Sequence, residues 1–392
     1  MVNRNYWIQR IEEAWKTRNV IWLAGVRRAG KTVLCQSLEN VAYYDCELPR
    51  IRMQMEDPQG FLDGLKGRRV VLDEIHRLGN PSELLKIAAD HYPDIHIIAT
   101  GSSSLGASSK FGDTLTGRKT DIWLTPLSSR DLENFGNTDL SHRMLHGGLP
   151  PFFLAGSPPE AQFQEWMDAY WSKDIQELFR LERKASFQKF VELILLHSGG
   201  IFEASTYAAP CEVSRTTISN YLSVLSATYV AHVIKPFNTH RPAEIVSAPK
   251  VYAFDTGFIC AFRGWDTLRE EDRGVLWEHL VLNEFQTAFG RTAINYWRDK
   301  RGHEVDFVIP GLGRRSPVAV ECKWRANRFE NRGLAAFRRT YPEGLNIVIA
   351  HDVEQPFKRT VGGLEVTFHS LNTAVNAIGE GRTDLGKTIF LQ

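Results

Sequence analysis

Short apolar segments alternate with helical segments over the first third of the chain. Apolar stretches occur at residues 20–24, 41–44, 70–72, 95–100 and 121–124. Such stretches, separated by segments with helical spacing, are typical of a mostly parallel α/β sheet. Near-helical spacing of apolar residues also predicts a helix over residues 1–20. The pattern therefore predicts an α/β fold for the N-terminal region.

Two changes of pattern divide the rest of the chain. Residues 147–151 form a Gly- and Pro-rich turn signal, and from 158 to about 234 the apolar spacing is mainly helical. Beyond residue 249, strand-like and helical segments mix again. We therefore expect three modules, at residues 1–145, 146–248 and 249–392.

The middle module contains a segment, residues 204–225, that looks like a helix-turn-helix. Ser214 is suited to cap the second helix, because its hydroxyl can accept a hydrogen bond from a free backbone N–H. Apolar residues of that helix would face inward, namely Ile218, Tyr221, Leu222 and Leu225. Residues 229–237 would form a wing. Winged helices bind DNA and also serve as contact surfaces for proteins, and the sequence leaves both open.

Composition narrows the class of protein. The chain has 392 residues with 47 Lys or Arg and 46 Asp or Glu, a formal net charge of +1. This balance excludes a globally basic nucleic-acid coat but not a local basic patch. The five cysteines form no CxxC pair, so neither a disulfide framework nor a zinc module is indicated. Without an apolar segment suited to a membrane span or signal peptide, we expect a cytoplasmic protein with no membrane partner.

The strongest motif is a phosphate-binding loop. Residues 25–32 read Gly-Val-Arg-Arg-Ala-Gly-Lys-Thr, which satisfies G-x-x-x-x-G-K-[ST]. A predicted strand precedes the motif and a predicted helix follows it, the context in which backbone N–H groups close around phosphate oxygens. Lys31 is expected to reach the β- and γ-phosphates of ATP, and the Thr32 hydroxyl to bind Mg²⁺. The loop residues expected to hold the nucleotide are Gly25, Arg28, Ala29, Gly30, Lys31 and Thr32.

Two acidic residues, Asp73 and Glu74, directly follow the apolar stretch 70–72. Asp73 is expected to hold Mg²⁺ through water, and Glu74 to polarise the attacking water. A glutamate directly after the metal-binding aspartate indicates hydrolysis rather than phosphoryl transfer to a small acceptor.

Polar residues after the next strand are further candidates. Thr100 ends the stretch at 95–100 and Ser102 follows it, and both are suited to sense the γ-phosphate, the alternative being a turn without a catalytic role. Arg118 could stabilise transition-state charge, either in its own chain or from a neighbouring subunit. A solvated or structural arginine is the alternative.

Residues 19–127 resemble the AAA-type ATPase domain found in many bacterial and archaeal proteins. The resemblance rests on residues 25–32, 72–77, 100–104, 115–118 and 126–128, with a further match at 147–150. It implies an additional-strand (ASCE-type) P-loop sheet with ATP and Mg²⁺ as cofactors. It also implies a C-terminal domain of uncharacterised function, and self-association is common among AAA-type relatives.

A second group of candidate residues lies near the C-terminus. The pattern there predicts the order α-β-β-β-α-β, with Asp306 in the second strand. Glu321 and Lys323 are two residues apart in the third strand, so they face the same side. Two carboxylates that bind Mg²⁺ beside a lysine that orients water would suit phosphodiester hydrolysis.

This arrangement resembles the PD-(D/E)xK, restriction-endonuclease-like superfamily. Asp306, Glu321 and Lys323 match its D…ExK positions, and Glu278 matches the first-helix glutamate of the resolvase-like members. The resemblance implies a catalytic site with metal at Asp306 and Glu321; an inactivated fold that only binds nucleic acid is the alternative. Residues 291–340 carry 12 Lys or Arg against 5 Asp or Glu, which favours a polyanionic partner.

Together these patterns predict an ATP-hydrolysing enzyme that acts on nucleic acid, expected to be DNA, and that carries a nuclease-like domain. Two other functions stay open. One is a regulatory ATP switch whose C-terminal domain binds a partner without cutting it. The other is a remodeller of proteins.

Overall fold

The computed structural model describes residues 2–101, 115–157, 160–179, 181–238, 248–290, 294–311 and 316–380. The chain forms two compact units. The first comprises residues 1–139, 148–189 and 211–230, and the second comprises residues 140–147, 190–210 and 231–392. The predicted middle module, residues 146–248, therefore contributes to both units instead of standing alone.

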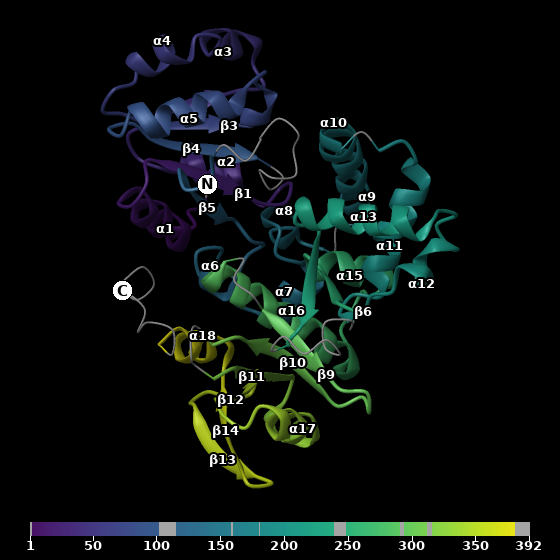
Figure 1. Ribbon diagram of the computed structural model, residues 1–392. Coiled ribbons are helices and arrows are strands. Elements are labelled where there is room, and N and C mark those ends of the chain that lie inside the picture. Colours follow the sequence, from purple (N-terminus) through teal and green to yellow (C-terminus); the bar gives the residue numbers. More distant parts are fainter. Residues whose placement is uncertain are drawn as a thin grey trace. The chain divides into compact units, whose positions relative to one another are not determined.

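The first unit is built on a five-stranded sheet in the order β2-β3-β4-β1-β5 (Figure 1). All neighbouring strands pair in parallel, so the predicted parallel P-loop type of sheet is confirmed. The strands are β1 (Val20–Ala24), β2 (Val41–Asp45), β3 (Arg69–Asp73), β4 (His96–Gly101) and β5 (Lys119–Trp123). Strand β1 lies between β4 and β5 and is buried along its whole length.

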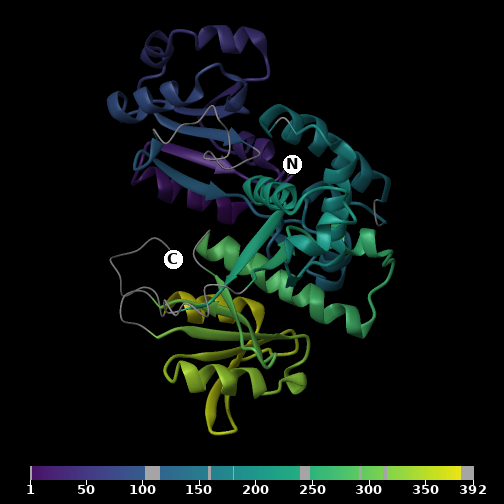
Figure 2. The same ribbon diagram turned by 45° about the vertical axis from the view of Figure 1, so that its right-hand side comes forward.

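Helices cover both faces of this sheet. Helix α1 (Asn5–Trp15) and helix α5 (Pro81–His91) lie on opposite faces in both views (Figures 1 and 2). Helix α1 is shorter than the predicted helix over residues 1–20, and it buries Trp7, Ile11 and Trp15. The other helices before the first change of unit are α2 (Lys31–Gln36), α3 (Pro49–Gln54), α4 (Pro58–Asp63), η1 (Ile75–Arg77) and α6 (Ser129–Leu132).

A helical layer completes the first unit. It contains α8 (Pro150–Phe153), α9 (Glu160–Ala169), a π-helical turn at Tyr170–Ile175, α10 (Gln176–Phe179) and α13 (Arg215–Ala227). Ser214 caps α13 as predicted, since its Oγ accepts a hydrogen bond of 3.1 Å from the Thr217 backbone N–H. The side chains predicted to face inward are buried, namely Ile218, Tyr221, Leu222 and Leu225.

The second unit is built on a mixed nine-stranded sheet, β13-β14-β12-β11-β10-β9-β7-β8-β6. Its strands are β6 (Gly200–Ile201), β7 (Ala231–Pro236), β8 (Lys250–Ala253), β9 (Asn295–Arg298), β10 (Glu304–Ile309), β11 (Val318–Lys323), β12 (Asn346–Ala350), β13 (Phe357–Val361) and β14 (Leu364–His369). The predicted wing is strand β7, and it pairs in parallel with β9. This pairing explains why the predicted boundary near residue 249 does not separate two units.

The helices of the second unit confirm the predicted α-β-β-β-α-β order, which is α16, β9, β10, β11, α17, β12. The unit contains α7 (Leu140–His146), α12 (Ala204–Ala208), α15 (Thr256–Arg263), α16 (Glu270–Phe289), η5 (Ala326–Arg328), α17 (Arg332–Thr340) and α18 (Leu371–Glu380), while α11 (Lys184–Leu196) crosses from one unit to the other. Within the described ranges, no helix combines the length and apolar character needed to cross a bilayer.

Candidate functional site

The phosphate loop lies at the carboxyl end of β1, an inner strand of the parallel sheet. Strand β1 ends at Ala24 and helix α2 begins at Lys31. A Cβ on Gly25 would lie 2.5 Å from the backbone oxygen of Leu124, and Gly30 has a φ of 96°. Both positions therefore need glycine, one for close backbone approach and one for its left-handed conformation. The loop has the tight turn that brings backbone N–H groups toward phosphate oxygens.

The Lys31 side chain folds back along this loop. Its Nζ donates hydrogen bonds to the carbonyl oxygens of Gly25, at 2.7 Å, and Val26, at 3.3 Å. Burial lowers the pKa of Lys31, against the opposing charges of nearby carboxylates, first that of Glu74. Charged phosphate oxygens are stronger acceptors than carbonyls, so a nucleotide would draw the ammonium group toward itself.

Asp73 gathers hydroxyl groups from neighbouring elements at the end of β3. Thr32 Oγ1 donates to Asp73 Oδ2 at 2.8 Å, and the hydroxyls of Thr100 and Tyr43 also donate to this carboxylate. The structure thus brings together the predicted residues Thr32, Asp73 and Thr100. Hydroxyl and carboxylate oxygens are the ligands that Mg²⁺ prefers, so Thr32 and Asp73 fit the predicted metal. Tyr43 was not predicted as a site residue, although the sequence analysis recognised the apolar stretch at 41–44 that contains it.

Glu74 follows Asp73 in a left-handed backbone conformation, with a φ of 51°. Its backbone N–H donates to Thr100 Oγ1 at 2.9 Å, which ties the acidic pair to the end of β4. Burial would raise the pKa of Glu74, but the hydrogen bond from His76 and the charge of Lys31 outweigh it and lower the pKa to about 2. Glu74 is therefore ionised at neutral pH, as a general base must be.

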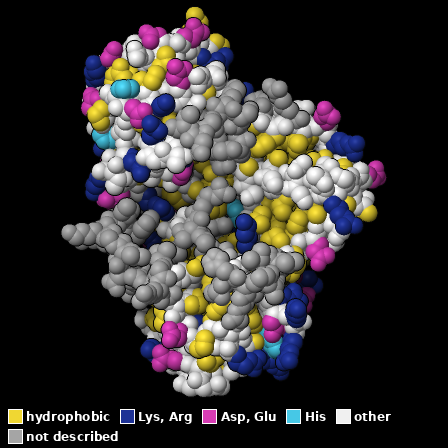
Figure 3. Space-filling view, viewed as in Figure 1, with side chains coloured by type: hydrophobic (Ala, Val, Ile, Leu, Met, Phe, Trp, Pro, Cys, Tyr) yellow, Lys and Arg dark blue, Asp and Glu magenta, His cyan; other side chains and the backbone are white. Residues whose placement is uncertain are grey.

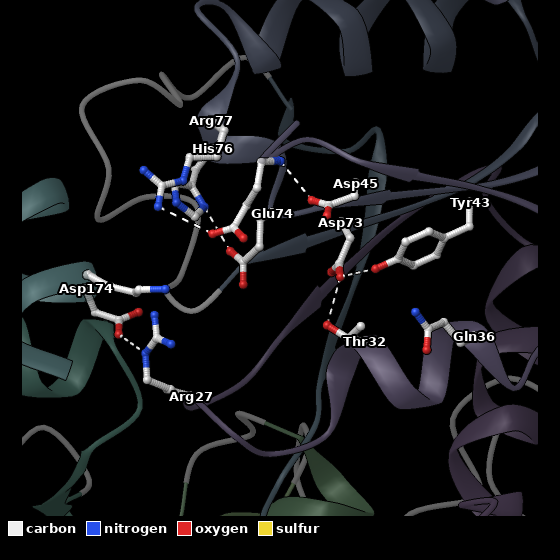
Figure 4. Close-up of a pocket in the computed structure, with 12 residues that line it drawn as sticks. Arg27, Thr32, Gln36, Tyr43, Asp45, Asp73, Glu74, His76, Arg77 and Asp174 are labelled. Atoms are coloured by element: carbon white, nitrogen blue, oxygen red, sulfur yellow. Dashed lines mark hydrogen bonds and ion pairs between the residues drawn. The ribbon is translucent and has the colours of Figure 1, made fainter. Parts of the chain in front are cut away.

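These side chains line a cavity of about 320 Å³, and Figure 4 shows them around it. The phosphate loop contributes Arg27, α2 contributes Thr32, and the end of β3 contributes Asp73 and Glu74. The helical layer contributes Lys173 and Asp174 from the π-helical turn. The helical layer is therefore part of the site, which the sequence did not predict.

Two of the residues predicted to contact the nucleotide, Arg118 and Ser102, are not confirmed by the structure. Arg118 directly precedes Lys119, the first residue of β5. Lys119 pairs with Val20, the first residue of β1. Arg118 is thus at the edge of the sheet away from the phosphate loop, where its Nε donates to Asp90 at 2.7 Å. The prediction that it reaches a phosphate in its own chain is corrected; a contact from a neighbouring subunit stays a prediction. Ser102 lies outside the described residues.

The second unit brings the other predicted group together on adjacent antiparallel strands. Lys323 Nζ on β11 lies 2.7 Å from Glu321 Oε2 and 3.3 Å from Asp306 Oδ2 on β10. The Cys322 backbone N–H also donates to Asp306, at 2.7 Å. Burial and then the charge of Asp306 raise the pKa of Glu321 to about 8. The acid pair and the lysine therefore form one compact cluster, as the spacing predicted.

Glu278 of α16 joins this cluster through a residue that the sequence did not single out. Lys250 on β8 lies 3.3 Å from Glu278 Oε1 and 2.5 Å from Glu304 Oε1, and Tyr252 also hydrogen-bonds to Glu278. Burial and then the charge of Asp306 raise the pKa of Glu278 to about 7. The signal that could have identified Lys250 and Tyr252 is their spacing, because two residues that are two positions apart in a strand lie on the same face.

The donor chemistry of the cluster suits a divalent metal only in part. Asp306 and Glu321 offer carboxylate oxygens, the ligands that Mg²⁺ prefers. Within the described ranges, however, no group of three or more His, Cys, Asp or Glu side chains is arranged to hold a metal ion. The residues present therefore fit a metal held by two carboxylates and completed by water and substrate.

Positive charge gathers near this cluster. Lys and Arg side chains crowd the surface where Figure 1 places the β9–β10 hairpin and α17 (Figure 3). The hairpin contributes the exposed residues Arg298, Lys300 and Arg301. Three of the 12 basic residues counted between 291 and 340 are therefore exposed on one hairpin.

Three families match successive segments of the chain. Residues 17–133 match the family described as AAA domain. Residues 137–269 and 273–367 match two domains of unknown function, DUF8612 and DUF4143. The first match spans the five-stranded sheet with its phosphate loop, which supports an AAA-type ATPase in this region. The second and third carry no functional description.

Several known proteins are similar to this chain. Uncharacterized proteins of Mycobacterium tuberculosis and Mycobacterium bovis are each 26% identical over 335 residues, covering 82% of this chain and 74% of the relative. Among solved structures, a Walker-type ATPase of Pyrococcus abyssi is 15% identical with a TM-score of 0.44, covering 67% of this chain and 96% of that one. A DNA clamp loader delta protein of Bacillus subtilis is 12% identical with a TM-score of 0.26, covering 70% and 99%.

Proposed function

We propose that this chain hydrolyses ATP in a Mg²⁺-dependent reaction and couples the cycle to action on nucleic acid, specifically DNA. The cavity in which the phosphate loop meets Asp73 and Glu74 carries the first half of the proposal. The loop N–H groups and Lys31 bind the β- and γ-phosphates. Bound at Thr32 and Asp73, Mg²⁺ would neutralise charge on the phosphate oxygens.

Glu74 acts as the general base of this reaction. Its ionised carboxylate accepts a proton from the attacking water and orients that water toward the γ-phosphorus. Thr100 hydrogen-bonds to the backbone of Glu74 and to the carboxylate of Asp73. It therefore fixes the general base, Glu74, in position relative to the metal ligand, Asp73. The same threonine is placed to respond when the γ-phosphate leaves.

The convergence of Asp306, Glu321 and Lys323 supports a second activity, metal-dependent cleavage of phosphodiester bonds. The two carboxylates would hold the metal, and the Lys323 ammonium would orient water and balance phosphate charge. The basic turn between β9 and β10 supports a polyanionic substrate. If the cluster does not cut, the alternative is an ATP switch or protein remodeller whose C-terminal region only binds.

The ATPase proposal is tested by steady-state turnover of ATP with Mg²⁺, comparing the wild type with Lys31→Ala. We expect loss of tight ATP binding in the variant, because its loop keeps no ammonium for the phosphates. Lys16→Ala is the matched control, since Lys16 is exposed and pairs with Glu13 on α1. Equal ATP affinity in Lys31→Ala would refute the phosphate-loop assignment.

The nucleic-acid proposal is tested with labelled single-stranded, duplex and branched DNA in the presence of Mg²⁺, with and without ATP. We expect cleavage by the wild type and none by Lys323→Ala. Lys358→Ala is the control, because Lys358 forms a similar lysine–glutamate pair, at 2.9 Å, on the exposed strand β13. No cleavage in any condition would favour a binding module, and ATP turnover unaffected by DNA would favour the protein remodeller.

A further inference from the structure

The nucleotide cavity contains an arginine that the sequence motif leaves unassigned. Arg27 lies inside the phosphate loop and lines the cavity beside Thr32. Its side chain is 25% exposed, and in Figure 4 the guanidinium group points toward the open space that the Glu74 carboxylate also faces. Arg27 and Glu74 line the same cavity, and the charge of Arg27 acts on both Glu74 and Lys31.

The helical layer holds Arg27 at two points. Asp174 Oδ2 accepts a hydrogen bond of 2.7 Å from Arg27 Nε, and Trp166 Nε1 donates one of 3.0 Å to the Arg27 carbonyl oxygen. Asp174 is 3% exposed and lies in the π-helical turn. A π-helical turn within an α-helix re-aims the side chains after it, and such turns are frequent at functional sites. Here the turn presents a buried carboxylate to a loop arginine.

The contact with Asp174 uses Nε of the guanidinium group and not Nη1 or Nη2. Among the described residues, the Arg27 side chain forms its hydrogen bond and ion pair through Nε alone. Nη1 and Nη2 therefore remain for a ligand in the cavity. The other arginine lining the cavity, Arg77, lies 3.5 Å from Glu47 and sits on the 3₁₀ turn after β3.

We propose that Arg27 binds the terminal phosphate of the nucleotide and that Asp174 is its positioning residue. Two donors on one planar group match two phosphate oxygens, a geometry that lysine cannot reproduce. Asp174 holds the guanidinium group through Nε, so Nη1 and Nη2 are already oriented when the phosphate binds. This inference rests on the proposed ATP hydrolysis, and it supplies from within the loop the arginine that Arg118 does not provide in its own chain.

The test compares ATP and ADP affinities, kcat and KM for the wild type, Arg27→Ala, Arg27→Lys, Asp174→Asn and the double variant Arg27→Ala/Asp174→Asn. We expect Arg27→Ala to weaken ATP about tenfold more than ADP and to lower kcat by roughly 10- to 100-fold. Arg27→Lys should recover only part of this loss. Because Asp174 acts through Arg27, the double variant should be no worse than Arg27→Ala.

A matched control is Arg69→Gln, which removes an ion pair with Glu12 at 2.8 Å. Arg69 lies at the start of β3, so this pair is at the edge of the sheet opposite the phosphate loop. This variant should leave the preference for ATP over ADP unchanged. A purely structural role for Arg27 would lower the melting temperature while keeping that preference and kcat, and this result would overturn the inference alone. A wild type that binds neither nucleotide would overturn the proposed function and this inference together.

Discussion

The hydroxyl of Thr32 donates a hydrogen bond of 2.8 Å to the carboxylate of Asp73, which joins the start of α2 to the end of β3. The two residues are 41 positions apart in the chain. Their contact shows that the two halves of the predicted Mg²⁺ site are assembled by the parallel sheet, because the carboxyl ends of its strands share one edge.

Thr32→Val should weaken binding of Mg²⁺–ATP about tenfold, since it removes one oxygen ligand and one of the hydroxyl donors to the Asp73 carboxylate. Affinity for ATP in the presence of a chelator should change much less. Nucleotide titrations with and without Mg²⁺ check this. Ser37→Ala is the control at the other end of α2, where the Ser37 hydroxyl donates to the Leu34 carbonyl of its own helix. Equal losses with and without Mg²⁺ would contradict the metal role.

Glu74→Gln should keep ATP binding and lower kcat by roughly 10²- to 10⁴-fold, because the amide cannot accept the proton of the attacking water. Single-turnover hydrolysis and equilibrium binding, measured on the same preparation, check the two halves of this expectation. Glu56→Gln, at an exposed position, should behave as the wild type. Normal turnover in Glu74→Gln would assign the base to another residue.

Glu321 should make the folded protein less stable as pH rises. Its pKa, raised to about 8 by burial and then by Asp306, exceeds the ordinary value of 4.5, so the folded chain keeps a proton that the unfolded chain releases. This contribution is complete below about pH 4.5 and is lost as pH rises through about 8. Urea unfolding from pH 5 upward should show a falling free energy of unfolding in the wild type.

Glu321→Gln cannot ionise and should flatten this part of the pH dependence. Glu330→Gln provides the comparison, because the Glu330 side chain is 73% exposed and lies outside the acidic cluster. If Glu321→Gln and the wild type had parallel stability curves, the buried proton would belong to another group.

Ser214→Ala should reduce the stability of the first unit by about 1 kcal/mol, because it removes the side-chain cap of α13. Thermal unfolding followed by circular dichroism measures the shift. Ser219→Ala is a fitting control, since the Ser219 hydroxyl donates back to the Arg215 carbonyl within the helix. A larger effect for Ser219 than for Ser214 would argue against the cap.

Local patterns were sufficient for the elements and for residues close to one another in the chain. The glycines of the phosphate loop, the capped helix after Ser214 and the shared face of Glu321 and Lys323 each follow from spacing within a few residues. The proximity of Asp73 and Thr32 was also predictable, because the carboxyl ends of parallel strands lie at the same edge of a sheet.

Register and packing between distant segments decided the rest. Pairing of β5 with β1 moved Arg118 to the far edge of the sheet, and pairing of β7 with β9 brought Lys250 to the acidic cluster. The contact of Asp174 with Arg27 spans 147 positions. Spacing along the chain determines which way a side chain faces within its own element. What that face meets depends on burial and pairing with segments far away, and only the tertiary structure contains that information.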